Sequence, residues 1–241
     1  MLKRTLAVAA TLAATAALAT SSASTAQAAA LPTSGTGWKL ATQLGVTSAS
    51  PTQTYTVTYQ SDAVRKFYAP QIQRAVDQIN ASTDLNLAIG GVEPMDPSKC
   101  GPDFHIQVME LRNPMGDSKP GWSQGMPCPF PEKGMSRGGQ VAMNSTYRSG
   151  EWSSISQTQL QNTAVHEMLH AVGLDHPNYD VDKDGTVENY ECVATSYGNK
   201  PIMCSPNGGY STWNNVGKIV ASFDEKGIDA LIANARAQGL K

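Results

Sequence analysis

The chain has 241 residues, of which 40% are hydrophobic and 16% charged, and its formal net charge is −2 at pH 7. This length suits one domain with a substantial core. The weakly acidic chain has no basic stripe, so we expect neither nucleic-acid nor anionic-membrane partners.

The first 28 residues have the three parts of a secretory signal peptide. Lys3 and Arg4 form a positive start, residues 6–18 are apolar and Ala-rich, and residues 26–28 read Ala-Gln-Ala, a small-residue cleavage site. The apolar stretch is shorter than the roughly 20 residues of a membrane span. Removal of residues 1–28 changes the net charge to −4 and predicts a secreted, extracellular protein.

Residues 29–53 are rich in Ser, Thr, Ala and Gly and predict a flexible arm or short propeptide. They contain no cysteine, which excludes a cysteine-type latency switch in this segment. The remaining residues, 54–241, are expected to form the folded domain.

The domain begins with a pattern that predicts a βαβ-like unit. Residues 55–59 alternate as on a strand, and residues 70–80 have helical apolar spacing, with a first turn expected after Asp62. Residues 85–92 and 104–111 then predict two further strands.

The middle of the chain predicts a loop-rich rim followed by a short strand. Residues 112–137 are rich in Gly and Pro and could border a substrate cleft, and residues 140–144 are the strand candidate. Near the C-terminus, Ser222 and Glu225 have the spacing of a capping box before a terminal helix.

A second capping box, Ser156 with Gln159, predicts a helix that runs to about Gly173. Residues 166–176 in and after this helix read H-E-x-x-H-x-x-G-x-x-H, the pattern of three zinc ligands with one catalytic carboxylate. A buried core helix with histidines is the alternative, but its apolar face lies opposite the histidines, so both interpretations are compatible.

The first two ligands lie one helical turn apart. His166 and His170 are separated by about 40° around the axis and about 6 Å along it, so both imidazoles can bind one ion. Glu167 projects beside that ion, where it can accept a proton from zinc-bound water.

The third ligand requires the helix to end. On a continuous helix His176 would lie about 9 Å beyond His170, but Gly173 tolerates positive φ and can turn the chain back. His176 is therefore expected to complete the site, with Asp175 as a nearby rival one residue short of the pattern.

Residues 180–191 match the twelve-residue calcium loop position for position. Gly185 permits the sharp turn, and His176-Pro177 disfavours an incoming EF-hand helix, so we expect a lone structural calcium loop rather than a sensor. An acidic surface loop without an ion is the alternative. The expected ligands are Asp180, Asp182, Asp184, Thr186, Glu188 and Glu191.

Four cysteines in an exported chain indicate two disulfides, for which three pairings are possible. Pairing of neighbours, Cys100 with Cys128 and Cys192 with Cys204, is the simplest of the three. A cysteine-ligated metal is disfavoured because no CxxC spacing occurs.

The zinc motif followed by Pro201-Ile202-Met203-Cys204-Ser205 resembles the metzincin metalloproteases, which carry a methionine-containing turn after the zinc helix. The resemblance covers about the last hundred residues and places Met203 as a hydrophobic floor beneath the zinc histidines. It implies an α+β fold with a mixed, mostly parallel twisted sheet and two long helices. The cleft would lie above a smaller C-terminal subdomain with the Met-turn and terminal helix.

Among metzincins, the chain is most similar to small secreted bacterial proteases of the snapalysin type, which place Asp at the position of His176. Some metzincins also carry Tyr two residues after the turn methionine. This chain has Ser205 there, and Tyr210 could substitute for it.

The sequence therefore predicts a secreted, monomeric zinc endopeptidase that acts on polypeptides, with Glu167 as general base. Two other functions are compatible with the same residues. One is a catalytically silent calcium-binding module with a structural zinc, and the other is a zinc hydrolase of a non-peptide amide.

Overall fold

The computed structural model describes residues 30–151, 155–206 and 217–241. The chain divides into two compact units, Met1–Ala30 and Leu31–Lys241, and all secondary structure of the described residues lies in the second. The strands are β1 (Ser34–Gly35), β2 (Trp38–Leu40), β3 (Ser48–Ala49), β4 (Thr54–Tyr59), β5 (Asn86–Val92), β6 (His105–Leu111), β7 (Gln124–Phe130), β8 (Met135–Asn144) and β9 (Leu174–Asp175). The helices are the 3-10 helix η1 (Thr42–Leu44) and the α-helices α1 (Asp62–Ser82), α2 (Thr146–Ser149), α3 (Gln157–Val172) and α4 (Asp224–Ala237).

Six strands form the main sheet, in the order β3-β8-β6-β4-β5, with β7 paired to β8. All neighbours are parallel except β7, which runs antiparallel to β8. The βαβ unit predicted at the start of the domain is β4-α1-β5. The predicted mixed, mostly parallel sheet with two long helices is thus confirmed.

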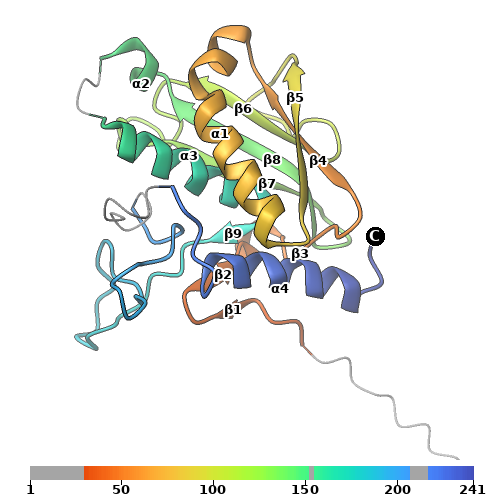
Figure 1. Ribbon diagram of the computed structural model, residues 1–241, viewed down its shortest axis with the longest axis vertical. Helices are drawn as coiled ribbons and strands as arrows, with labels where there is room; N and C mark the ends of the chain where they lie inside the picture. The colour runs from red at the N-terminus through yellow and green to blue at the C-terminus, as the bar shows by residue number, and fades with distance from the viewer. Residues whose placement is uncertain (1–29, 152–154, 207–216) are drawn as a thin grey trace, which may run out of the picture. The chain divides into compact units, whose positions relative to one another are not determined.

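Helices α1 and α3 lie side by side against one face of this sheet (Figure 1). The Ser61 hydroxyl caps α1 by accepting the N–H of Val64 at 3.2 Å, so the helix begins at Asp62, as the sequence predicted for its first turn. The core between helices and sheet is apolar and includes the fully buried side chains of Val57, Ile72, Ile106, Val141, Leu160 and Leu169. Among the described helices, none is long and apolar enough to cross a membrane.

The segment 29–53, predicted as a flexible arm or short propeptide, is built into this fold over its described residues. It supplies β1 to β3 and η1; β2 pairs with β9, and β3 pairs with β8. The expected flexibility is therefore corrected: Val46 and Ala49 are fully buried within a polar stretch, and they anchor it to the core. The average composition of the segment gives no sign of these few buried positions.

The segment 112–137, predicted to be loop-rich, contains β7 and the first residues of β8. Pro127 and Pro129 lie in β7, which pairs with β8 alone among the described strands, so its other edge needs no ladder hydrogen bonds. The pairing shifts register between these two prolines. The strand predicted over 140–144 is correspondingly longer, because β7 extends the pairing back to Met135.

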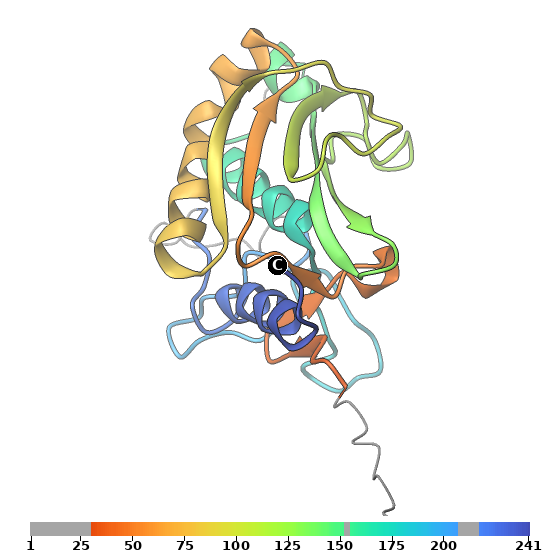
Figure 2. The same ribbon diagram turned by 90° about the vertical axis from the view of Figure 1, so that its right-hand side faces the viewer.

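Helix α4 lies below the sheet, against β2 and β3, in both views (Figures 1 and 2). The capping box predicted for Ser222 and Glu225 does not form, since the N-cap is Phe223 and no side chain caps it. Instead, the fully buried carboxylate of Asp224, the first residue of the helix, accepts the N–H of Val220 at 2.7 Å.

Candidate metal centre

Helix α3 presents two of the predicted ligands and then ends at the predicted glycine. Its first turn has both hydrogen bonds of the Ser156–Gln159 capping box. At its end Gly173 has φ = 124°, and a Cβ there would lie 2.6 Å from Cγ1 of Val46. Glycine is thus required both for the turn and for space, and the chain continues into β9 and His176.

The structure brings the three predicted zinc histidines together. The Nε2 atom of His166 lies 3.1 Å from those of His170 and His176, and the latter two are 3.0 Å apart. Asp175, the rival ligand, is engaged elsewhere: its carboxylate lies 2.7 Å from the Lys39 ammonium.

The backbone fixes which ring nitrogens face one another. His166 Nδ1 lies 2.8 Å from the Ile202 carbonyl oxygen, and His170 Nδ1 lies 2.8 Å from that of Leu174. Carbonyl oxygens only accept, so both rings carry their hydrogen on Nδ1 and direct a lone pair from Nε2 toward the shared centre.

These residues fit a zinc ion. Lone pairs 3.1 Å apart cannot hydrogen-bond to each other, and they repel unless a cation lies between them. Three nitrogens bound to Zn²⁺ at about 2.0–2.1 Å and tetrahedral angles would be about 3.3 Å apart, close to the observed separations. Backbone carbonyls on the far nitrogens are also the usual partners of metal-binding histidines.

Burial keeps these histidines neutral, as metal binding requires. Burial first, and then the neighbouring imidazoles, lower the pKa of His166 to about 3 and the pKa values of His170 and His176 to about 4.

Glu167 lies beside the histidines in a nearly closed environment, with 5% of its surface exposed. Burial raises the pKa of Glu167 to about 8, against the opposing hydrogen bond from the backbone N–H of Gly125. A Cβ at Gly125 would collide with the Glu167 carbonyl oxygen and lie 2.6 Å from His170 Cβ. Strand β7 can therefore approach α3 closely only because this residue is glycine.

The segment predicted as a Met-turn lies next to the first ligand. Ile202 and Met203 are both 1% exposed, and the Ile202 carbonyl accepts from His166. The buried Asp224 carboxylate accepts the N–H groups of Ile202 at 2.9 Å and Met203 at 3.2 Å. Burial raises the pKa of Asp224 to about 7, against the effect of these donors.

Both disulfides have the pairing expected as simplest, Cys100 with Cys128 and Cys192 with Cys204. The second closes the segment that leads into Met203. Asn178 adds a further tie, because its side chain donates to the Ser205 carbonyl at 2.8 Å and accepts the Ser205 N–H at 2.7 Å.

The three histidines and Glu167 open into one cavity of about 360 Å³. Its walls come from the N-terminal segment, from the segment before β7, from β7 and from the end of the Met-turn. The lining residues outside the metal centre are Ala41, Gln43, Leu44, Met115, Lys119, Trp122, Ser123, Gln124, Gly125, Met126, Leu174, Asp175, Ser205 and Pro206.

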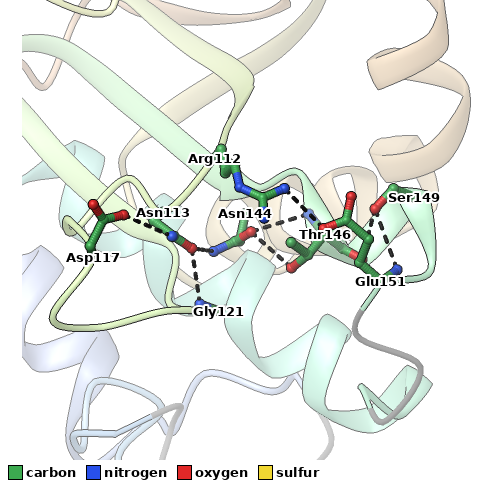
Figure 3. A network of polar contacts seen from close by, with 8 residues as sticks. All are labelled: Arg112, Asn113, Asp117, Gly121, Asn144, Thr146, Ser149 and Glu151. Atoms are coloured by element: carbon green, nitrogen blue, oxygen red, sulfur yellow. Dashed lines mark hydrogen bonds and ion pairs between the residues drawn. The ribbon is translucent and has the colours of Figure 1, made fainter.

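A polar network fixes the segment 113–123, which lines one side of this cavity (Figure 3). Asn144 at the end of β8 is fully buried and donates at 3.3 Å to both the Asn113 side chain and the Trp122 carbonyl. Asn113 in turn accepts the N–H of Gly121 and donates to Asp117. The segment 113–123 is therefore a loop fixed at both ends, consistent with the cleft rim expected for this region.

In the predicted calcium loop, one carboxylate oxygen each from Asp180, Asp182 and Asp184 lies within 4.8 Å of the other two. Backbone N–H groups of the loop turn inward, and Glu191 accepts those of Val181 at 2.5 Å and Glu188 at 2.8 Å. The neighbouring Glu191 carboxylate raises the pKa of Glu188. The remaining expected ligand, Thr186, donates its N–H to Asp184 at 2.8 Å.

Sequence reasoning missed Gly125, Asp224 and Asn144. Gly125 lay in a Gly- and Pro-rich stretch without a strand signal, and the Asp224 carboxylate acts on a turn 21 residues earlier in the chain. His105 contacts the Glu93 carboxylate at 2.8 Å and does not line the cavity of the metal centre. Tyr210, the possible substitute for the missing tyrosine, lies outside the described residues.

No protein-family model and no curated protein matches the sequence. Among solved structures, the chain is similar to high choriolytic enzyme 1, a hatching-enzyme zinc protease from the medaka fish Oryzias latipes. The two are 14% identical with a TM-score of 0.33, over 73% of this chain and 88% of that one. It is also similar to myroilysin, at 15% identity and a TM-score of 0.39, over 76% of this chain and 82% of that one. At these values the likeness assigns the chain to no family.

Proposed function

We propose that this protein is a secreted zinc-dependent endopeptidase of the metzincin type. One observation carries the proposal: three imidazole nitrogens converge within 3.1 Å beside a buried carboxylate, all lining one cavity. His166, His170 and His176 would hold the ion, and Met203 would form the apolar floor of the centre. The leader of residues 1–28 and the two disulfides support export.

Zn²⁺ at such a centre supplies Lewis acidity toward a peptide carbonyl and makes water acidic near neutral pH. Glu167 would receive a proton on its carboxylate and deliver it to the departing amine. In the metal-free protein, burial raises the pKa of this carboxyl, and the backbone N–H of Gly125 opposes that effect.

The substrate is proposed to be an extended polypeptide. Strand β7 pairs with β8 alone among the described strands, and its residues Gln124, Gly125 and Met126 line the cavity. A peptide added along this edge would bring its backbone past the metal centre, the usual way in which a sheet edge recognises a chain.

We also propose that residues 180–191 bind one structural Ca²⁺. The convergence of Asp180, Asp182 and Asp184 supports this, together with the match of the whole loop to the calcium pattern. The loop follows His176, so an ion there would order the segment between the third zinc ligand and the Met-turn.

The proposed activity is tested by Glu167→Gln, which keeps the shape of the side chain but removes its basicity. Purified protein is assayed on an unfolded polypeptide, with bound zinc measured in parallel. We expect cleavage to fall by at least about 10³-fold with zinc retained. The exposed Glu132→Gln, on the turn between β7 and β8, is the matched control and should keep full activity.

Equal activity of Glu167→Gln and the wild type would refute the mechanism. If the wild type binds zinc but does not cleave polypeptides, two functions remain: a zinc hydrolase of a non-peptide amide and a catalytically silent module. Hydrolysis of a non-peptide amide panel would then indicate the amide hydrolase, and silence there too would indicate the non-catalytic module.

A further inference from the structure

Two large apolar side chains that the fold leaves exposed line the cavity of the metal centre. Leu44, in the 3-10 helix η1, is 38% exposed, and Met126, in strand β7, is 40% exposed. Both line the cavity into which the three histidines and Glu167 open. Single exposed apolar side chains are common, but two from distant parts of the chain that share one cavity offer a ligand an apolar surface.

Helix η1 is fixed at both ends by backbone hydrogen bonds. Before the helix, the N–H of Ala41 donates at 2.8 Å to the carbonyl of Gly173, at the turn that ends α3. After it, the N–H of Thr47 donates at 2.8 Å to the carbonyl of Gly134, between β7 and β8. Val46, just past the helix, is fully buried. The helix is therefore anchored to the fold although its own three side chains are exposed.

The same helix lies beside strand β7. It ends at Gly45, and a Cβ placed there would lie 3.7 Å from Cγ of Pro129 in β7. Leu44 and Met126 therefore reach the cavity from neighbouring elements. Gly125, which precedes Met126, contacts α3 at the metal centre. The apolar pair thus lies next to the metal centre, toward the C-terminal end of β7.

This side of the cavity has no charge of its own. The other cavity-lining residues of the N-terminal segment are Ala41 and Gln43, and those of β7 are Gln124 and Gly125. A charged group of a substrate would lose water here without gaining a partner of opposite charge. An apolar side chain would instead be stabilised by the burial of its surface.

We propose that Leu44 and Met126 form an apolar subsite that binds a large aliphatic or aromatic side chain of the polypeptide substrate. Strand β7 runs from Gly125 at the metal centre toward Met126, and antiparallel pairing is the commoner arrangement of neighbouring strands. A substrate paired in this way places the residues before the scissile bond along Met126. The inference rests on the proposed endopeptidase and adds a preference on the N-terminal side of the cleaved bond.

The test is the cleavage of peptides that share one sequence except at a single position near the scissile bond. Each position on either side of the bond is in turn Leu, Phe, Gln or Glu, and the ratio of kcat/KM values gives the preference there. We expect the wild type to prefer Leu or Phe over Gln and Glu by about tenfold at one position before the bond, the lower end of what apolar pockets achieve.

The variants Leu44→Lys and Met126→Lys distinguish a subsite from general damage. An ammonium group in the subsite should raise the ratio of Glu to Leu cleavage at that position by at least about tenfold, because it pairs with the substrate carboxylate. Misfolding would instead lower the cleavage of both peptides. Ile89→Lys on β5 is the matched control and should keep the wild-type ratio, since Ile89 is 39% exposed and does not line the cavity. Bound zinc and the melting temperature are measured for each variant.

A wild type that cleaves the peptides without an apolar preference before the bond would overturn the inference, as would an unchanged ratio in both lysine variants at the active cavity. An equal change in Ile89→Lys would likewise show an effect of overall charge rather than of a subsite. If the wild type binds Zn²⁺ but cleaves none of the peptides, the proposed function fails first, which distinguishes the two failures.

Discussion

At the scale of single residues, the centre depends on close approaches that tolerate no added atom. Gly125 meets α3 where the backbone of Glu167 and the side chain of His170 leave no room for a Cβ. The backbone N–H of Gly125 also lowers the pKa of the Glu167 carboxyl, against the larger effect of burial. The convergence of the three histidines could be predicted from sequence because their spacing is local, whereas this contact joins two distant elements.

Gly125→Ala should therefore disturb the metal centre, although it adds only one methyl group. The added methyl group must displace β7 from α3, and overpacking of this kind costs about 1–3 kcal/mol. We expect a lower melting temperature and at least a tenfold loss of the proposed peptidase activity. Gly91→Ala in β5 is the control, since nothing lies within 4 Å of a Cβ there. Equal behaviour of the two variants would contradict the packing argument.

The pKa values of the three histidines predict how the stability of the metal-free protein changes in acid. Their folded-state pKa values of about 3 to 4 lie below the ordinary 6.5, so the unfolded chain binds more protons between these values. The contribution of the neutral histidines to the free energy of unfolding is therefore fully present above pH 6.5 and is lost as the pH falls toward 4. Urea unfolding of the metal-free protein at pH 7 and pH 4.5 should show a larger loss of stability for the wild type than for His170→Gln. A loss of equal size in both would refute this.

At the scale of elements, α3 could be predicted almost to its ends, and β7 could not be predicted at all. The capping box, the apolar face and the terminal glycine of α3 are signals carried by neighbouring residues. Strand β7 carries two prolines and no alternating pattern, and it exists because β8 offers it a partner. The N-cap of α4 was mispredicted because it also depends on a distant contact. The Asp224 carboxylate at the start of the helix accepts N–H groups of the predicted Met-turn.

Asp224 should matter for the Met-turn as much as for its own helix. Asp224→Ala leaves three backbone N–H groups without their acceptor, each at a cost of about 1 kcal/mol or more, so we expect a loss of about 3 kcal/mol in unfolding free energy. Zn²⁺ affinity should fall as well, because Ile202 also orients His166. Denaturant unfolding and chelator competition measure the two effects. The exposed Asp229→Ala on the same helix should change neither.

The proposed calcium loop makes a separate prediction. Saturating Ca²⁺ should raise the melting temperature by about 5 °C or more, since a ligand at 100 times its Kd adds about 2.7 kcal/mol to stability. Asp180→Asn should remove most of this response, and Asp229→Asn should keep it. A melting temperature that ignores both Ca²⁺ and its chelation would leave only an acidic surface loop.

At the scale of the whole molecule, the two disulfides stabilise different parts of the fold. Closure of loops of 28 and 12 residues stabilises the native state by about 3.5 and about 3 kcal/mol in the chain-entropy description. Cys100→Ala with Cys128→Ala should lower the melting temperature and leave Zn²⁺ affinity unchanged. Cys192→Ala with Cys204→Ala should lower both, because Cys204 adjoins Met203. Equal Zn²⁺ affinity of the two double variants would contradict this division.

The composition of residues 29–53 was a poor guide to their place in the fold. Residues 29–53 resemble a linker in composition, yet Leu40, Val46 and Ala49 are fully buried, and the described part of the segment contacts both β9 and α4. Such a role depends on which distant surfaces are left uncovered, and no local pattern records it. The mixed, mostly parallel sheet was expected from the resemblance to the metzincins, and only its β4-α1-β5 start had a local pattern of its own.

The buried Asp224 also sets an order of events during synthesis. A growing chain exposes its three histidines well before the carboxylate that holds the Met-turn has been made. The carbonyl partner of His166 is thus secured only once α4 has emerged and docked. A zinc centre at this site would then be complete only when the last helix of the chain is in place.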